Sequence, residues 1–214
     1  AGPTNWWGKR GLCRMEFISS SDELEALYGE PGAPSLRKVA RQMTPLYRKW
    51  IMASKLCMLA TAGPEGTDGS PRGDDGPVVR ELDPETLALP NWRGNNRLDS
   101  LRNIVRDPRV SLMFLVPGES NAVRVNGTAF LTADDTARAA FERKSLRPAT
   151  VAVITVEELY FQCAKAIMRA RLWDADAGRP DVPTAGQFLK EQEAGFEAEA
   201  YDAGYTEYAK SRIR

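Results

Sequence analysis

The sequence predicts a mainly β fold, an antiparallel barrel of six or seven strands with helices at its periphery. Six or seven short segments have the apolar or alternating pattern of strands, and glycine, proline and aspartate separate them. Few long helical segments lie between these strands, which argues against a doubly wound parallel sheet. With 214 residues, 43% of them hydrophobic, the chain can bury a core of useful size.

The expected strands occupy the middle of the chain. Apolar composition and length predict strands at 56–61, 70–72, 78–82, 86–89, 110–116, 123–132 and 151–156, the last continued by 160–163. Residues Gly63 to Gly66 have the composition of a turn. Asn126 and Gly127 interrupt the longest segment, which indicates a β-bulge.

Helices are expected before, between and after the strands. Ser21 and the acidic residues behind it predict a helix that ends at Gly29. Apolar residues at three- and four-residue steps predict a longer helical stretch from Ser35 to Ile51, with a break or kink at Thr44-Pro45. The remaining expected helices are at 99–106, 134–141 and beyond, 184–190 and 197–212.

Composition excludes several classes of function. The chain has no histidine, which removes Ser-His-Asp and Cys-His catalysis and every metal site that needs imidazole; we expect no metal site. Net charge is zero and no apolar run spans a bilayer, so neither nucleic acid nor a membrane is an expected partner. Three scattered cysteines indicate a reducing compartment, hence a cytoplasmic protein.

The first 14 residues differ from the rest. Residues 1–14 show neither a helix nor a strand period, and they lack the apolar centre of a signal peptide. We expect them to be a flexible arm or a start-site extension. Residues 15–214 contain no repeat or low-complexity linker and are predicted to form a single domain.

Three segments concentrate groups that bind anions. The loops 69–76 and 91–97 contain arginine and asparagine, and the second directly precedes a helix N-terminus, where backbone N–H groups favour negative charge. A phosphate monoester near Arg72, Asn96 and Arg97 would be well satisfied. Segment 161–173 adds Lys165 and two arginines. Turn chemistry alone also explains the two loops, and a solvated basic surface explains the third segment.

The order of these segments resembles the pyridoxamine 5'-phosphate oxidase-like superfamily, the FMN-binding split-barrel flavoproteins. The likeness spans about residues 37–173 and is closest to a bacterial subgroup of FMN-dependent enzymes of unknown substrate. It rests on an ordered set of motifs, namely Cys57-Met58-Leu59-Ala60-Thr61, Ser70-Pro71-Arg72-Gly73-Asp74, Leu89 to Ile104, Pro108-Arg109-Val110, Arg124 to Ala129 and Gln162-Cys163-Ala164-Lys165-Ala166.

The resemblance implies FMN as the cofactor, bound at the interface of a homodimer. The strand Arg72-Gly73-Asp74 would lie along the flavin ring, and Arg72 could also reach the phosphate. Asn95, Asn96 and Arg97 match the cluster that holds the FMN phosphate. Lys165 would approach from the late strand, in a dimer from the partner subunit.

The implied activity is that of an FMN-dependent oxidoreductase that acts on an unidentified small molecule, with NAD(P)H or oxygen as electron partner. A true pyridoxamine-phosphate oxidase is not expected, because its Arg-x-His-x-Arg-like substrate signature needs a histidine that this chain lacks. The alternative is a non-catalytic flavin- or haem-binding protein on the same barrel. The sequence identifies no catalytic residue.

Overall fold

A computed structural model describes residues 17–178 and 180–210, so the expected arm at 1–14 lies outside the described residues. The chain divides into two compact units, 1–38 and 39–214, and each is described by itself. The first unit contains α1 (Ser21–Tyr28) and α2 (Ala33–Arg37). The side chain of Ser20 caps α1, and Gly29 ends it with a φ of 71°. A single domain over 15–214 stays a prediction.

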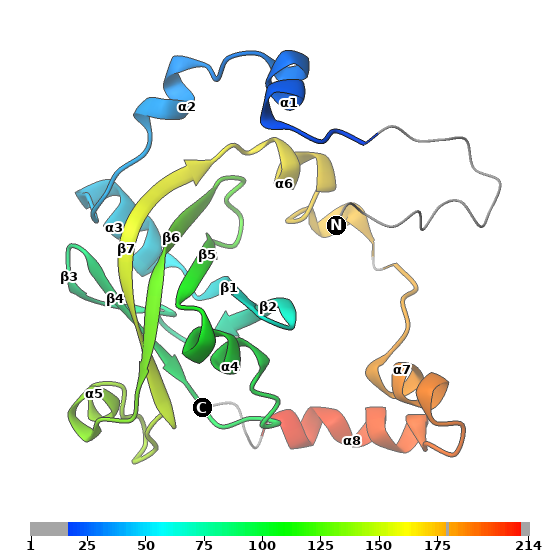
Figure 1. Cartoon of the computed structure of the whole chain (residues 1–214). Coiled ribbons are helices and arrows are strands. Elements are labelled where there is room, and N and C mark those ends of the chain that lie inside the picture. Colours follow the sequence, from blue (N-terminus) through cyan, green and yellow to red (C-terminus); the bar gives the residue numbers. More distant parts are fainter. Residues whose placement is uncertain (1–16, 179, 211–214) are drawn as a thin grey trace. The chain divides into compact units, whose positions relative to one another are not determined.

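The second unit is built on one antiparallel sheet of seven strands, in the order β2-β1-β5-β6-β7-β4-β3 (Figure 1). The strands are β1 (Leu56–Gly63), β2 (Gly66–Gly73), β3 (Arg80–Asp83), β4 (Thr86–Asn91), β5 (Arg109–Leu115), β6 (Ala122–Thr132) and β7 (Thr150–Gln162). Among the described residues no pairing joins the edge strands β2 and β3, so the sheet is not closed. The prediction of an antiparallel split barrel of six or seven strands with peripheral helices is confirmed, and the number of strands is seven.

The alternation of side chains along the strands places the core on one face of this sheet. In β1 the residues Cys57, Leu59 and Thr61 are buried and those between them are more exposed, and β5 and β6 alternate in the same way. Apolar side chains from all but the two edge strands join one cluster, whose largest fully buried members are Phe114, Ile51, Leu59, Leu87, Leu89, Leu112, Ile154 and Leu159.

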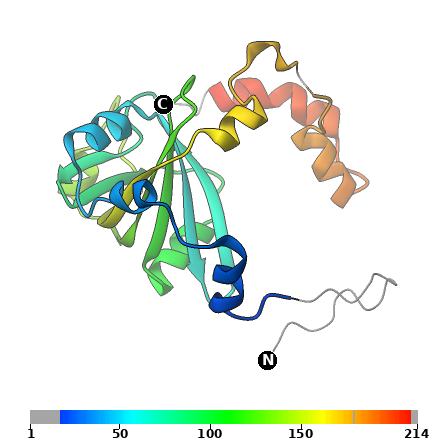
Figure 2. The same ribbon diagram turned by 90° about the horizontal axis from the view of Figure 1, so that it is seen from above.

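The predicted bulge in the 123–132 strand is confirmed. The register between β6 and β7 shifts between Asn126 and Gly127. A Cβ on Gly127 would lie 1.9 Å from the carbonyl oxygen of Thr155, so only glycine fits at this position. Figure 2 gives the same sheet seen from above.

The helices of the second unit are short. They are α3 (Pro45–Ala53), α4 (Asp99–Arg106), α5 (Asp135–Ala139), α6 (Lys165–Ala170), a 3₁₀ turn (Ala175–Ala177), α7 (Ala185–Gln192) and α8 (Ala198–Lys210). In the part of the chain that is described, no helix is long and apolar enough to span a membrane.

Two helical predictions need correction. The stretch expected from Ser35 to Ile51 is not continuous before the predicted break, because Ala40 exchanges backbone hydrogen bonds of 2.9 and 2.8 Å with Leu159 of β7. A residue bonded to a sheet in this way cannot continue a helix. The helix after Asp134 ends at Ala139, before Phe141, because the next N–H groups bond three residues back and tighten the chain into turns.

Candidate functional site

One face of β2 carries three polar side chains that turn toward the interior of the open sheet. Asp68, Ser70 and Arg72 pair in register with Thr61, Leu59 and Cys57 of β1, all three of which are buried. Directly paired residues project to the same side of a sheet. The polar side chains of this edge strand therefore lie on the inner face of the sheet.

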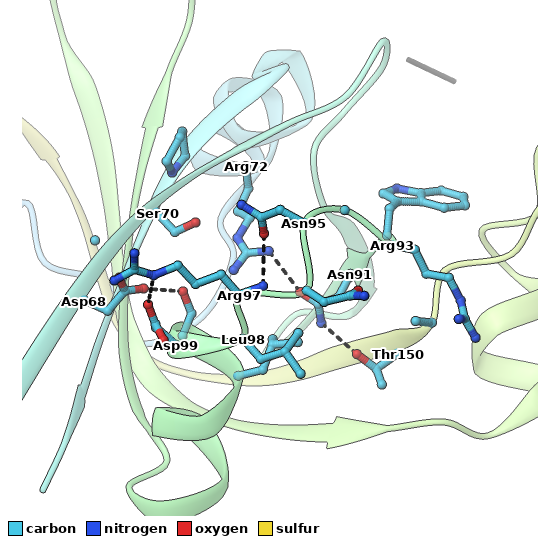
Figure 3. A pocket seen from close by; sticks show the side chains of 18 residues that line it. Asp68, Ser70, Arg72, Asn91, Arg93, Asn95, Arg97, Leu98, Asp99 and Thr150 are labelled. Carbon is cyan, nitrogen blue, oxygen red and sulfur yellow. Dashed lines mark hydrogen bonds and ion pairs between the residues drawn. The ribbon is translucent and has the colours of Figure 1, made fainter. Parts of the chain in front are cut away.

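These side chains form one wall of a pocket of about 550 Å³. The opposite walls are the end of β4, the loop that follows it, the first turn of α4 and the start of β7 (Figure 3). The lining residues are Asp68–Arg72, Asn91–Leu101, Ala149 and Thr150. The pocket thus lies at the opening of the split barrel, and its volume is within the usual range for small-molecule sites.

Arg72 is a half-buried cation with few partners. Its Nη1 lies 3.5 Å from Oδ1 of Asn91, and the Nδ2 group of Asn91 donates to Oγ1 of Thr150 at 3.3 Å. Its Nε atom is buried and has no hydrogen-bond partner among the described residues. Burial lowers the pKa of Arg72, while Cys57 and Asp68 act in the opposite direction. A guanidinium in this setting is stabilised by any anion that enters the pocket.

The loop before α4 presents the predicted asparagine and arginine cluster at the pocket. Asn95 accepts a hydrogen bond from the backbone N–H of Arg97 at 3.0 Å, and Asn96 has a φ of 58°, which asparagine tolerates better than most residues. The Arg97 side chain is 80% exposed and donates to Asp99 at 2.5 Å, and this hydrogen bond raises the pKa of Arg97.

Two hydrogen bonds fix α4 to the strands behind the loop. Ser100 donates its hydroxyl to Asp68 of β2, and Asn103 donates to Oγ1 of Thr61 of β1 at 3.1 Å. Ser100 and Asn103 lie three residues apart and so share one helix face, while Asp68 and Thr61 are register partners. The first turn of α4, and with it the end of the loop, is held against β1 and β2.

A second hollow of about 450 Å³ adjoins the pocket. It shares Asp68, Arg97 and Asp99 with the pocket and extends along α4, where Arg106 pairs with Glu65. Its charges are largely paired with one another.

The structure brings together four of the seven predicted cofactor-binding residues. Arg72, Asn95, Asn96 and Arg97 line the pocket. Gly73 and Asp74 lie beyond it at the end of β2, and Asp74 forms an ion pair with Arg143. Lys165 is the exposed first residue of α6 and does not line the pocket.

Sequence reasoning gave no role to Asp68, Ser100 or Thr150, which also line the pocket, and it included Ser70 and Asn91 only as members of the two anion-binding loops. The spacing of Asp68, Ser70 and Arg72 is a strand alternation that could have indicated the first two. Asn91 and Thr150 are register partners of β4 and β7 that lie 59 positions apart, and no local signal predicts such a pair.

The fold and the pocket place the protein in the class of open, split β-barrels with a polar ligand site at the opening. A family model described as pyridoxamine 5'-phosphate oxidase matches residues 43–163, more than half of the chain. The chain belongs to the pyridoxamine 5'-phosphate oxidase family. Every residue that lines the pocket falls within the matched range, whereas Lys165 follows it by two positions.

Among solved structures, HupZ from Group A Streptococcus is 21% identical, with a TM-score of 0.45 over 55% of this chain and 91% of that chain. General stress protein 26 from Bacillus anthracis is 17% identical, with a TM-score of 0.42 over 53% and 88%. An F420 reductase is 18% identical, with a TM-score of 0.39 over 56% and 98%. These likenesses say nothing about ligand or reaction. No curated protein matches the sequence.

Proposed function

We propose that this protein is an FMN-dependent oxidoreductase that acts on an unidentified small molecule. The observation that carries the proposal is the half-buried Arg72 guanidinium, whose Nε has no partner among the described residues and which lines a pocket of suitable size. Family membership supports a flavin as the ligand.

The residues present fit the terminal phosphate of FMN. Arg72 offers a guanidinium fork from the wall of the pocket, and Arg97 offers a second one from the exposed rim. Asn95 and Asn96 add neutral donors, and the first turn of α4 adds backbone N–H groups. Arg72 is the stronger of the two cationic contacts, because it is less exposed to solvent and has no carboxylate partner among the described residues.

Bound FMN would supply hydride or electron transfer through its ring. The chain's own contribution is position and electrostatics. The contact from Asn91, which itself donates to Thr150, limits the orientations of Arg72. Trp92 lines the pocket where a flat ring could pack. A positive group beside the pyrimidine side of the ring would stabilise reduced flavin, and Lys165 is the candidate for that role when Arg72 holds the phosphate.

Three parts of the proposal concern residues or molecules that are outside the pocket of a single chain. Gly73 and Asp74 would meet the flavin ring only if the ring extends along β2 beyond the pocket. Lys165 would reach a flavin held by the other subunit of a homodimer, with FMN at the interface. NAD(P)H or oxygen is the proposed electron partner, and a cytoplasmic location is proposed with it.

The visible spectrum of the purified protein tests the proposal. We expect a yellow protein, or a colourless one that takes up FMN in a titration with 1:1 stoichiometry per chain, and mass spectrometry should identify FMN in the released ligand. Anaerobic reduction by NADH or NADPH then separates an enzyme from a protein that only stores flavin. Protein that binds no FMN would refute the proposal, and a Soret band would favour a haem-binding protein instead.

A further inference from the structure

A carboxylate stands inside the pocket that is proposed to hold an anion. Asp68 lies on the same face of β2 as Arg72 and lines the pocket together with Arg97 (Figure 3). Its charge acts on both guanidinium groups, because it is among the influences that raise the pKa of each. It nevertheless forms an ion pair with neither, since no arginine nitrogen among the described residues lies within 4.0 Å of its carboxylate.

The hydrogen bonds of Asp68 leave one acceptor unused. Its Oδ2 accepts the hydroxyl hydrogen of Ser100, whereas no donor among the described residues bonds to Oδ1. The side chain is half-buried, so this oxygen is only partly hydrated. An ionised carboxylate in such a place is stabilised by a ligand that donates a hydrogen bond to it and destabilised by a ligand that brings only negative charge.

A pocket that contains both arginine and aspartate therefore favours a ligand that has two properties at once. The guanidinium groups of Arg72 and Arg97 favour a negative oxygen, and Asp68 favours an O–H group beside it. Inorganic phosphate at neutral pH has both, because each of its abundant forms keeps at least one P–OH group. Sulfate has nearly the same size and shape but no hydrogen to donate, so its oxygens would only repel the carboxylate.

We propose that Asp68 is a specificity-determining residue, which selects an oxyanion that carries a hydrogen-bond donor, a protonated phosphate, over a fully deprotonated anion such as sulfate. This inference rests on the proposed function and deepens it, because it concerns the same pocket. It implies that the FMN phosphate binds as its monoanion, the form of a phosphate monoester that keeps one P–OH group below its second pKa of about 6. It concerns the anion rather than the flavin, so the two can fail separately.

Competition between inorganic anions and FMN tests the inference. Flavin fluorescence reports bound FMN while potassium phosphate or potassium sulfate is added at pH 7 and constant ionic strength. In the unaltered protein we expect phosphate to displace FMN at a concentration at least about tenfold lower than sulfate, the size of one unsatisfied or repelled contact to a charged group. In Asp68→Asn the ratio should fall to about one, because the amide can donate to sulfate and accept from phosphate.

Two controls separate this effect from folding and from general charge. Asp68→Asn keeps an oxygen that can accept from Ser100, and its melting temperature shows whether the fold is intact. Glu65→Gln removes the same charge from the β1–β2 turn, where Glu65 pairs with Arg106 outside the pocket, and it should keep the phosphate preference.

The inference is overturned if sulfate competes as well as phosphate in the unaltered protein, or if Asp68→Asn keeps the preference. If FMN does not bind at all, the proposed function fails instead. The anion preference is then measured directly, by calorimetric titration of the same protein with phosphate and with sulfate, and the same two results decide it.

Discussion

A charged side chain on the inner face of β2 and one directly after the strand differ in whether the protein supplies a partner for the charge. Directly after the strand, the Asp74 side chain is 11% exposed and pairs with Arg143, and it also accepts the N–H of Asp75 at 2.7 Å. On the inner face, two residues earlier, Arg72 is half-buried and none of the described carboxylates pairs with it. The first charge is satisfied within the protein, and the second is not.

This difference separates a structural ion pair from a binding site. Removing a charge from water is costly, and proteins normally compensate by placing a counter-charge and hydrogen-bond partners beside it. Asp74 has both, so its charge is compensated within the protein and does not favour binding of a ligand. Arg72 has only a long contact to the neutral Asn91, which leaves its positive charge available for an anionic ligand. Four variants test this distinction.

Arg72→Met should have the largest effect on FMN binding. It keeps much of the side-chain volume but removes the charge and all guanidinium donors. One charge-assisted hydrogen bond contributes about 1.5–3 kcal/mol, roughly 10- to 150-fold in Kd, measured by flavin fluorescence titration. Arg72→Lys, which keeps the charge but not the forked donors, should bind FMN with an affinity between those of the original protein and Arg72→Met. An unchanged Kd in Arg72→Met would remove the basis of the phosphate assignment.

The double substitution Asn96→Ala with Arg97→Ala should weaken FMN binding by about tenfold, less than Arg72→Met. Arg97 is more exposed and already pairs with Asp99, so part of its interaction with phosphate replaces an existing ion pair. Retention of full FMN occupancy after dialysis would show that the loop does not hold the phosphate. An effect larger than that of Arg72→Met would reverse the ranking drawn from burial.

Local pattern predicted the elements well, and it predicted the loop half of the pocket. The strands β1 and β5, the bulge at Gly127 and the start of α4 all follow from neighbours in the sequence. The loop cluster at 95–97 was visible for the same reason, because its polar residues are consecutive.

The other half of the pocket depends on pairings between distant segments. The strand expected at 70–72 extends in the structure from Gly66 to Gly73, and only that length puts Asp68 on the same face as Arg72. The role of Asp74 was open to misreading for a related reason. Its partner Arg143 lies 69 positions away, so sequence alone cannot show that the carboxylate is already satisfied.

Gly63→Ala should produce a smaller, indirect reduction in FMN affinity. The new Cβ would lie 2.2 Å from Oδ1 of Asn103, so Asn103 must move and its bond to Thr61 is strained. The first turn of α4 would shift with it. We expect a fall in stability of about 1–3 kcal/mol in urea unfolding, with a Kd for FMN raised roughly two- to fivefold. Gly195→Ala is the control, because its Cβ would meet nothing within 4 Å and Gly195 does not line the pocket. Equal behaviour of the two variants would contradict the role given to the Asn103 side chain.

Asp74→Asn should have the smallest effect on FMN and a clear effect on stability. The amide keeps an acceptor for the Asp75 N–H but removes the charge that pairs with Arg143. Because the Arg143 side chain is 39% exposed, the cost should stay near the exposed end of the range, about 1–2 kcal/mol, or a fall of roughly 2–8 °C in melting temperature. The Kd for FMN should stay within about twofold of the original value, because neither member of this ion pair lines the pocket and substitutions at independent sites have nearly additive effects.

A double-mutant cycle that combines Asp74→Asn with Arg143→Gln isolates the energy of this ion pair from the other effects of each substitution. We expect the two single variants and the double variant to have similar melting temperatures, since each of them breaks the same pair. If Asp74→Asn instead releases FMN at an unchanged melting temperature, the inner face of β2 and the residue that follows the strand both bind the ligand, and the carboxylate lies beside the flavin ring as the family resemblance implies.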